Sequence, residues 1–157
     1  MIVPLRTIPS QGCVGWVLSR QEYKTLLRNA EESPIFVVPL EKPEGYVTLV
    51  VQFQFKDPKA KVALFTTLDD FRKGTFSASP HLTLTHYAEL AKRDAILVRG
   101  DVTTPKIINA FEARALIQRV YQHYLDPEKY ARWVRTFNHS SRSFDFNAYI
   151  KTLGFLA

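Results

Sequence analysis

The chain has 157 residues, a formal net charge of +6, 13% aromatic residues and one cysteine, Cys13. This length suits one domain that buries roughly two thirds of its unfolded surface. Lys and Arg are scattered singly, which argues against a nucleic-acid interface, and no stretch approaches the roughly 20 apolar residues of a membrane span. A single cysteine excludes an internal disulfide and a CxxC metal or redox site.

The first 18 residues are predicted to form an extended N-terminal arm, ahead of one domain over residues 19–157. Pro4 and Pro9 prevent a regular amphipathic helix in this arm. Arg6 and the absence of acidic residues up to Trp16 give it a faint likeness to a targeting peptide. The sequence does not decide whether a longer presequence has been removed.

The segment after the arm is predicted to be a helix followed by a buried strand. Ser19 is a suitable N-cap for a helix that continues to Asn29, and Ser33-Pro34 ends it. The continuous apolar run from Ile35 to Leu40 is typical of a strand buried on both faces.

Tyr46 to Phe55 is predicted to be the longest strand, and its two faces differ. One face is apolar, with Val47, Leu49, Val51, Phe53 and Phe55. The other has no charge and consists of Thr48, Val50, Gln52 and Gln54. This alternation indicates an antiparallel sheet with one covered face and one semi-polar face. The semi-polar face is expected either to lie under C-terminal helices or to form a shallow platform for an apolar segment of another protein.

The middle of the chain is predicted to return to the same sheet. A turn at Asp57-Pro58 leads to a strand over Val62–Thr66. Asp69 and Asp70 then favour the start of a short helix.

The segment from Pro80 to Gly100 is predicted to form a strand–helix–strand corner. Its strand contains Leu82 and Leu84, its short helix runs from Tyr87 to Ala91, and its second strand from Ala95 to Val98 stops at Arg99-Gly100.

The last third of the chain is predicted to be helical. Asn109 and Glu112 have the spacing of a capping box, Asp126-Pro127 starts another helix, and Asp145 is a suitable cap for the last one. The order of strands followed by helices indicates a single α+β domain. We expect a mainly antiparallel, twisted sheet of about five or six strands, flanked by helices.

No residue pattern indicates catalysis, a metal or a cofactor. His81 and His86 lie five residues apart, the other histidines are isolated, and the glycines form no phosphate-binding loop. The chain is therefore predicted to be a non-enzymatic binding protein without a cofactor. The candidate contact residues are the uncharged strand face and two aromatic residues, namely Thr48, Val50, Gln52, Gln54, Trp16 and Trp133.

Motifs in four parts of the chain, from about Ser19 to Leu153, resemble those of the mitochondrial ATP synthase assembly factors that chaperone the catalytic β subunit. The segment PHLTLTHYAELAKRDAILVRG at 80–100 is similar to the family's P-x-L-x-L-x-H-Y-x-x-L followed by R-G. The remaining motifs match in the same order. The residues that carry the likeness are Pro39, Gln52, Thr66, Leu68, Tyr87, Leu90, Arg99, Gly100, Phe137, Asn138 and Phe144.

The chain departs from the family pattern at three places. Glu41-Lys42 stands where an Arg usually follows the first P-L, residues 139–143 replace an expected proline, and the region before the shared part is shorter. The resemblance implies a chaperone in the mitochondrial matrix, or on the matrix side of the inner membrane, that shields the ATP synthase β subunit until the α subunit replaces it. The alternative is a permanent accessory subunit of the assembled ATP synthase, or of another mitochondrial membrane complex, built on the same fold.

Overall fold

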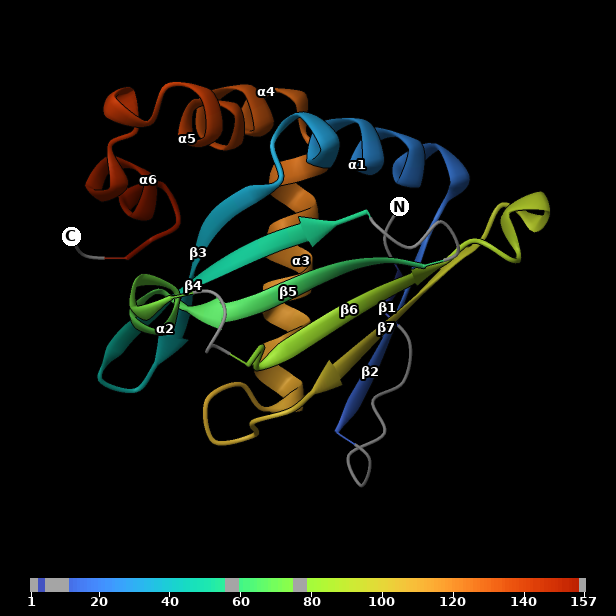
Figure 1. Ribbon diagram of the computed structural model, residues 1–157, viewed down its shortest axis with the longest axis horizontal. Coiled ribbons are helices and arrows are strands. Elements are labelled where there is room, and N and C mark those ends of the chain that lie inside the picture. The colour runs from blue at the N-terminus through green and yellow to red at the C-terminus, as the bar shows by residue number, and fades with distance from the viewer. Residues whose placement is uncertain (1–2, 5–11, 56–59, 75–78, 156–157) are drawn as a thin grey trace.

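A curved antiparallel sheet forms the centre of the protein in the computed structural model, which describes residues 3–4, 12–55, 60–74 and 79–155 (Figure 1). Within these residues the sheet has seven strands in the order β1-β2-β7-β6-β5-β4-β3, and every neighbouring pair is antiparallel. The strands are β1 (Val3–Pro4), β2 (Cys13–Leu18), β3 (Ile35–Lys42), β4 (Gly45–Gln54), β5 (Ala60–Thr67), β6 (Leu82–Tyr87) and β7 (Ile96–Val102). The expected α+β class with a mainly antiparallel sheet is confirmed. The predicted turn at Asp57-Pro58 lies outside the described residues.

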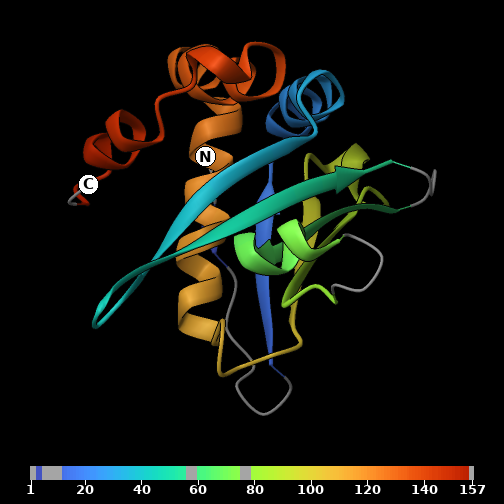
Figure 2. The same ribbon diagram turned by 60° about the vertical axis from the view of Figure 1, so that its left-hand side comes forward.

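The helices lie on both faces of this sheet and at one of its edges. The helix α1 (Arg20–Glu32) packs beside the long helix α3 (Ala110–Leu125), which crosses the inner face (Figures 1 and 2). The short helix α2 (Leu68–Lys73) lies on the opposite, outer face against β4 and β5. The C-terminal helical region lies beside β3 and consists of α4 (Pro127–Lys129), the π-helix η3 (Tyr130–Arg135), α5 (Thr136–His139), the 3-10 turn η4 (Ser141–Ser143) and α6 (Phe146–Thr152).

The end of the predicted N-terminal arm is part of the sheet. β2 lies between β1 and β7 and pairs with β7 over its whole length, from Cys13 opposite Asp101 to Leu18 opposite Ile96. Trp16 is only 4% exposed. Residues 13–18 are therefore an interior strand, while residues 5–11 of the arm lie outside the described residues.

Local capping signals place the helix starts where the sequence predicts them. Ser19 and Glu22 form a complete capping box at α1, and Asn109 and Glu112 form another at α3. The side chain of Asp145 accepts a hydrogen bond from the Ala148 amide at the start of α6. Each cap satisfies helix-end N–H groups that have no partner within the helix.

The predicted helix from Tyr87 to Ala91 is wrong. Tyr87 is the last residue of β6, where it pairs with Ala60 and Leu97, and a single 3-10 turn, η2 (Ala91–Arg93), follows. Because β6 pairs with β5 on one side and β7 on the other, it continues to Tyr87, where the local sequence favours a helix. β7 likewise continues through Arg99-Gly100 to Val102.

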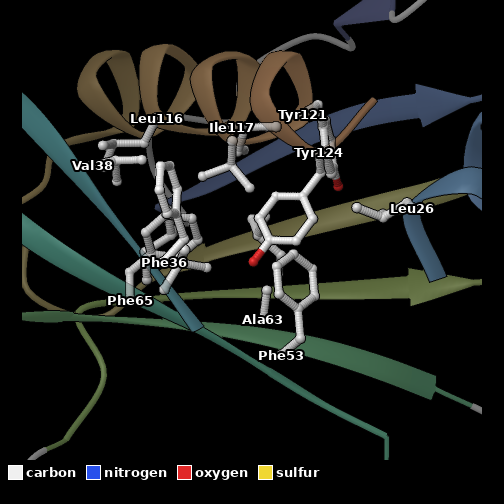
Figure 3. Close-up of a cluster of buried hydrophobic side chains, with 14 of the residues drawn as sticks. Leu26, Phe36, Val38, Phe53, Ala63, Phe65, Leu116, Ile117, Tyr121 and Tyr124 are labelled. Carbon is white, nitrogen blue, oxygen red and sulfur yellow. The ribbon is translucent and has the colours of Figure 1, made fainter. Parts of the chain in front are cut away.

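The core lies between the inner sheet face and the helices α1 and α3. Figure 3 shows Phe36, Phe53, Ala63 and Phe65 from the sheet close to Leu116, Ile117, Tyr121 and Tyr124 of α3. Gly100 leaves room on the inner face for side chains of the neighbouring strands β2 and β6 and of α3. A Cβ atom at this position would lie only 2.7 Å from Cγ2 of Val14, 3.3 Å from Cδ2 of Leu84 and 3.4 Å from Cδ1 of Ile117.

Candidate protein-binding groove

The alternation of β4 directs its two sets of side chains to opposite sides of the sheet. Leu49, Val51 and Phe53 enter the core against α3. Thr48 and Val50 face the outer side, where the short helix α2 crosses β4. Val50 is 1% exposed. The C-terminal helices were expected as one possible cover for this face. In the structure, the short helix α2 covers part of it instead.

An apolar groove lies on the outer side between α2 and the C-terminal aromatic residues. Its volume is about 370 Å³, which is within the usual range for ligand-binding pockets. Strands β3 and β4 form the floor, α2 forms one wall, and the chain from α5 to α6 forms the other. The lining residues are Ile35, Val37, Thr48, Val50, Leu68, Phe71, Arg72, Phe137, Phe144 and Phe146. These residues define what is called the outer groove below.

A cap and a histidine bridge fix the position of α2. The Thr67 side chain accepts a hydrogen bond from the Asp70 amide at 3.1 Å, which caps the helix. His81 Nε2 donates to Asp70 Oδ2 at 3.1 Å, and His81 Nδ1 lies 2.9 Å from Thr104 Oγ1. The hydrogen bond from His81 lowers the pKa of the Asp70 carboxyl. These contacts connect the helical wall of the outer groove to β6 and to the loop after β7.

Aromatic packing fixes the opposite wall. Phe36 contacts Phe137 and Phe144 edge to face, with ring centroids 5.9 and 6.3 Å apart, and Phe137 contacts Phe144 at 5.2 Å. Trp133 packs on Phe144 from behind at 6.1 Å. Edge-to-face aromatic pairs contribute about 0.5–1.5 kcal/mol beyond simple burial, so this wall is a firmly packed aromatic ridge.

Polar side chains occupy the free edge of β3 next to the outer groove. Asn138 accepts a hydrogen bond from the Ile35 amide at 3.2 Å and donates one to the Ile35 carbonyl at 2.6 Å. Pro39 has no N–H, and its carbonyl accepts a hydrogen bond from Arg119 Nη1 at 2.8 Å. Edge strands protected in this way resist pairing with another strand. The structure therefore favours contact through side chains in the outer groove over strand addition at this edge.

The outer groove unites residues from both sets that the sequence singled out. Thr48 and Val50 come from the predicted contact face, and Leu68, Phe137 and Phe144 come from the resembling motifs. Other predicted contact residues lie elsewhere. Gln52 is half-buried and Gln54 is exposed further along β4, outside the outer groove.

The two tryptophans predicted to contact a partner are buried. Trp16 packs beneath α3 beside Tyr121. Trp133 is 7% exposed and packs between Phe144 and Tyr149. Both side chains therefore stabilise the core, and Trp133 acts on the outer groove only by supporting its aromatic wall.

The remaining motif residues have several positions. Thr66 is buried on β5, Tyr87 is half-buried at the end of β6, and Leu90 is exposed in the following turn. Arg99 is exposed and forms an ion pair with Asp101 at 2.9 Å.

Sequence reasoning missed half of the outer groove. Ile35 and Val37 belong to a continuous apolar run, which does not show which side chains face the outer side. Phe146 directly follows the predicted cap Asp145. Phe71 and Arg72 follow the predicted helix start, three and four residues after Leu68. Residues at this spacing lie on the same side of a helix, which was the available signal that all three line one surface.

Two other hollows have polar and charged linings. One, of about 460 Å³, includes Glu22, Asp126 and Lys129. Another, of about 500 Å³, includes Arg28, Glu32 and Arg135. Their charged groups of both signs make them less suited than the outer groove to an apolar protein segment.

The buried histidines have structural hydrogen bonds. His86 Nδ1 donates to the Lys61 carbonyl at 3.0 Å, and its Nε2 lies 2.7 Å from Tyr121 Oη. Burial lowers the pKa of His86 to about 4 and that of His123 to about 4. Among the described residues no group of three His, Cys, Asp or Glu side chains is arranged to hold a metal ion. Across the same ranges no helix has the length and apolar character needed to span a membrane.

Comparison with known proteins connects this fold to one family. A family model described as "ATP11 protein" matches residues 5–150. "Protein atp11, mitochondrial" of Schizosaccharomyces pombe is 26% identical over 109 residues, which are 68% of this chain and 38% of that protein. "ATP synthase mitochondrial F1 complex assembly factor 1" is 27% identical in Danio rerio, covering 89% of this chain and 45% of that protein. The protein of the same name in Mus musculus is 24% identical, covering 87% and 41%.

This chain thus spans less than half the length of each of these relatives. All three are named as mitochondrial, which supports the mitochondrial localisation expected from the sequence.

Proposed function

This chain belongs to the ATP11 protein family, and we propose that it takes part in assembling the F1 portion of the mitochondrial ATP synthase as a non-catalytic binding protein. More specifically, it binds the free catalytic β subunit through the outer groove and shields an apolar segment of that subunit until the α subunit displaces it. This binding takes place in the mitochondrial matrix. Two relatives named as F1 assembly factors support the general role.

The outer groove is the observation that carries this proposal. Its floor and walls are apolar, and Arg72 is the one charged residue among the described residues that line it. An apolar segment of an unassembled subunit loses contact with water when it enters such a groove, at roughly 25 cal/mol per Å² of apolar surface buried. The small size of the outer groove limits this gain, which suits a chaperone because its partner must later be released.

A permanent accessory subunit is the other function considered for this chain. The relatives found by comparison are named as assembly factors, and they therefore do not favour it. Stoichiometry separates the two functions. An assembly factor co-purifies with unassembled β subunit, whereas a permanent subunit stays with the complete ATP synthase at a fixed ratio.

Two matched lysine substitutions on β4 test the proposal. Thr48→Lys places a charged side chain on the floor of the outer groove, and Gln54→Lys makes a similar change on the same strand face outside it. Purified mitochondrial β subunit is heated with each protein, and its aggregation is followed by light scattering. We expect the wild type and Gln54→Lys to delay aggregation and Thr48→Lys to lose this effect.

Near-UV circular dichroism and the Tm show whether each variant is folded. Wild-type protein that leaves β-subunit aggregation unchanged would contradict the chaperone function. A folded Thr48→Lys protein that protects as well as Gln54→Lys would exclude the outer groove as the binding site.

A further inference from the structure

Arg72 is the single charged residue among the described residues that line the outer groove. It lies on α2 four residues after Leu68 and next to Phe71, so all three belong to the helical wall. The Arg72 side chain is exposed, and it forms no hydrogen bond or ion pair with any residue that the structure describes. An unpaired guanidinium is thus placed at the border of an apolar surface.

The other charged residues of α2 have different surroundings. Asp70 is hydrogen-bonded to His81, and neither Asp69 nor Lys73 lines the outer groove. Arginine combines a planar pair of donors with weak hydration, and it binds a carboxylate through two parallel hydrogen bonds. A phosphate site normally gathers several donors or a helix N-terminus. A single arginine beside an apolar groove therefore matches a single carboxylate better than a phosphate.

We propose that the segment bound in the outer groove carries an Asp or Glu beside its apolar side chains, and that Arg72 pairs with this carboxylate. The inference rests on the proposed function, because it specifies the partner segment for the same groove. The apolar side chains supply most of the affinity, while the ion pair at the border fixes the register of the segment and speeds association.

The size of the outer groove restricts the form of the bound segment. A volume of about 370 Å³ is near the lower end of the range for ligand pockets. It holds a few side chains of a short segment, and the rest of the partner stays outside. A carboxylate adjacent in sequence to those side chains is then within reach of Arg72 on the groove wall.

Association kinetics with isolated mitochondrial F1 β subunit test this pairing. Wild type, Arg72→Gln and the control Lys73→Gln are compared at about 50 mM and about 500 mM NaCl, since salt screens exposed charges. The control removes the same charge from the neighbouring residue of α2. We expect Arg72→Gln to lower the association rate constant by roughly threefold or more at low salt. At high salt its rate should equal that of the wild type, and Lys73→Gln should match the wild type within about a factor of two under both conditions.

Two further variants separate this inference from the proposed function. Arg72→Lys keeps the charge but loses the paired donors, so it should retain the salt dependence and dissociate faster. If Thr48→Lys abolishes binding while Arg72→Gln behaves as the wild type at both salt concentrations, the carboxylate inference is overturned and the groove function stands. If folded Thr48→Lys binds the β subunit as the wild type does, the groove function itself fails.

Discussion

Replacing Gly100 with alanine tests how tightly the inner face of the sheet is packed around β7. The added methyl group would lie 2.7 Å from Cγ2 of Val14, with Leu84 and Ile117 also within 3.4 Å. Carbon atoms in favourable contact are about 3.5–4.0 Å apart, so the new methyl overlaps Val14 by about 1 Å. All three neighbours are buried in the core, so relieving this overlap requires a shift of packed side chains.

The expected loss of stability follows from two opposing effects. Inserting a methyl group into a packed core costs about 1–3 kcal/mol. Replacing glycine also restricts the unfolded chain, which stabilises the folded state by about 0.4–1 kcal/mol. The net loss in the free energy of unfolding for Gly100→Ala is therefore about 1–2 kcal/mol. In a protein of this size, each kcal/mol corresponds to a decrease in Tm of about 2–4 °C.

Urea unfolding measures this effect in the wild type, in the single variants Gly100→Ala and Val14→Ala, in their double variant and in a control. Arg99→Ala is the control, because Arg99 is exposed on the same strand and its ion pair contributes about 1 kcal/mol or less. The double variant Gly100→Ala/Val14→Ala removes the overlapping methyl group. It should be more stable than the sum of the two single losses predicts, by about 0.5 kcal/mol or more. A Gly100→Ala protein as stable as the wild type, or a double variant with strictly additive losses, would refute the close-packing argument.

Two further predictions concern polar side chains that are hydrogen-bonded to the backbone. Burial lowers the pKa of His86 to about 4, and an unfolded histidine titrates near 6.5, so protonation favours the unfolded chain. Between about pH 6.5 and 4, His86 and His123 should each lower the free energy of unfolding by up to about 1.4 kcal/mol per pH unit as the pH falls. His86→Gln should remove about half of this extra slope in urea unfolding, and an unchanged slope would contradict the assignment. Asn138→Leu removes both hydrogen bonds to Ile35. It should cost about 1–3 kcal/mol and speed hydrogen exchange of the Ile35 amide, whereas unchanged exchange would show that Asn138 does not protect this edge.

Features fixed by nearby residues could be predicted from the sequence. The capping boxes at Ser19 and Asn109 each need a partner only three residues away. The alternation along β4 likewise depends on neighbouring residues and correctly separates the core face from the outer face. These signals operate within one turn or one strand, so they do not depend on the tertiary fold.

Features that depend on distant residues could not be predicted in the same way. Tyr87 lies in a strand because it pairs with Ala60 and Leu97, whereas local sequence favoured a helix. The outer groove brings Thr48 of β4 next to Phe137 and Phe144, about ninety residues further along the chain. Residue spacing along the chain does not reveal such a contact. For the same reason, the sequence placed Trp16 at a partner-binding surface, whereas its side chain lies in the core.

Photo-crosslinking from α2 tests the central claim most directly, namely that the outer groove binds the free β subunit. A photoreactive benzoylphenylalanine replaces Phe71 in the outer groove or, as a control, Phe111, which is 83% exposed near the start of α3. The helices α2 and α3 lie on opposite faces of the sheet (Figure 2). After irradiation with purified mitochondrial β subunit, we expect crosslinked product from position 71 and little from position 111. Crosslinking from position 111 alone, or from neither position while the two proteins still bind, would contradict the claim.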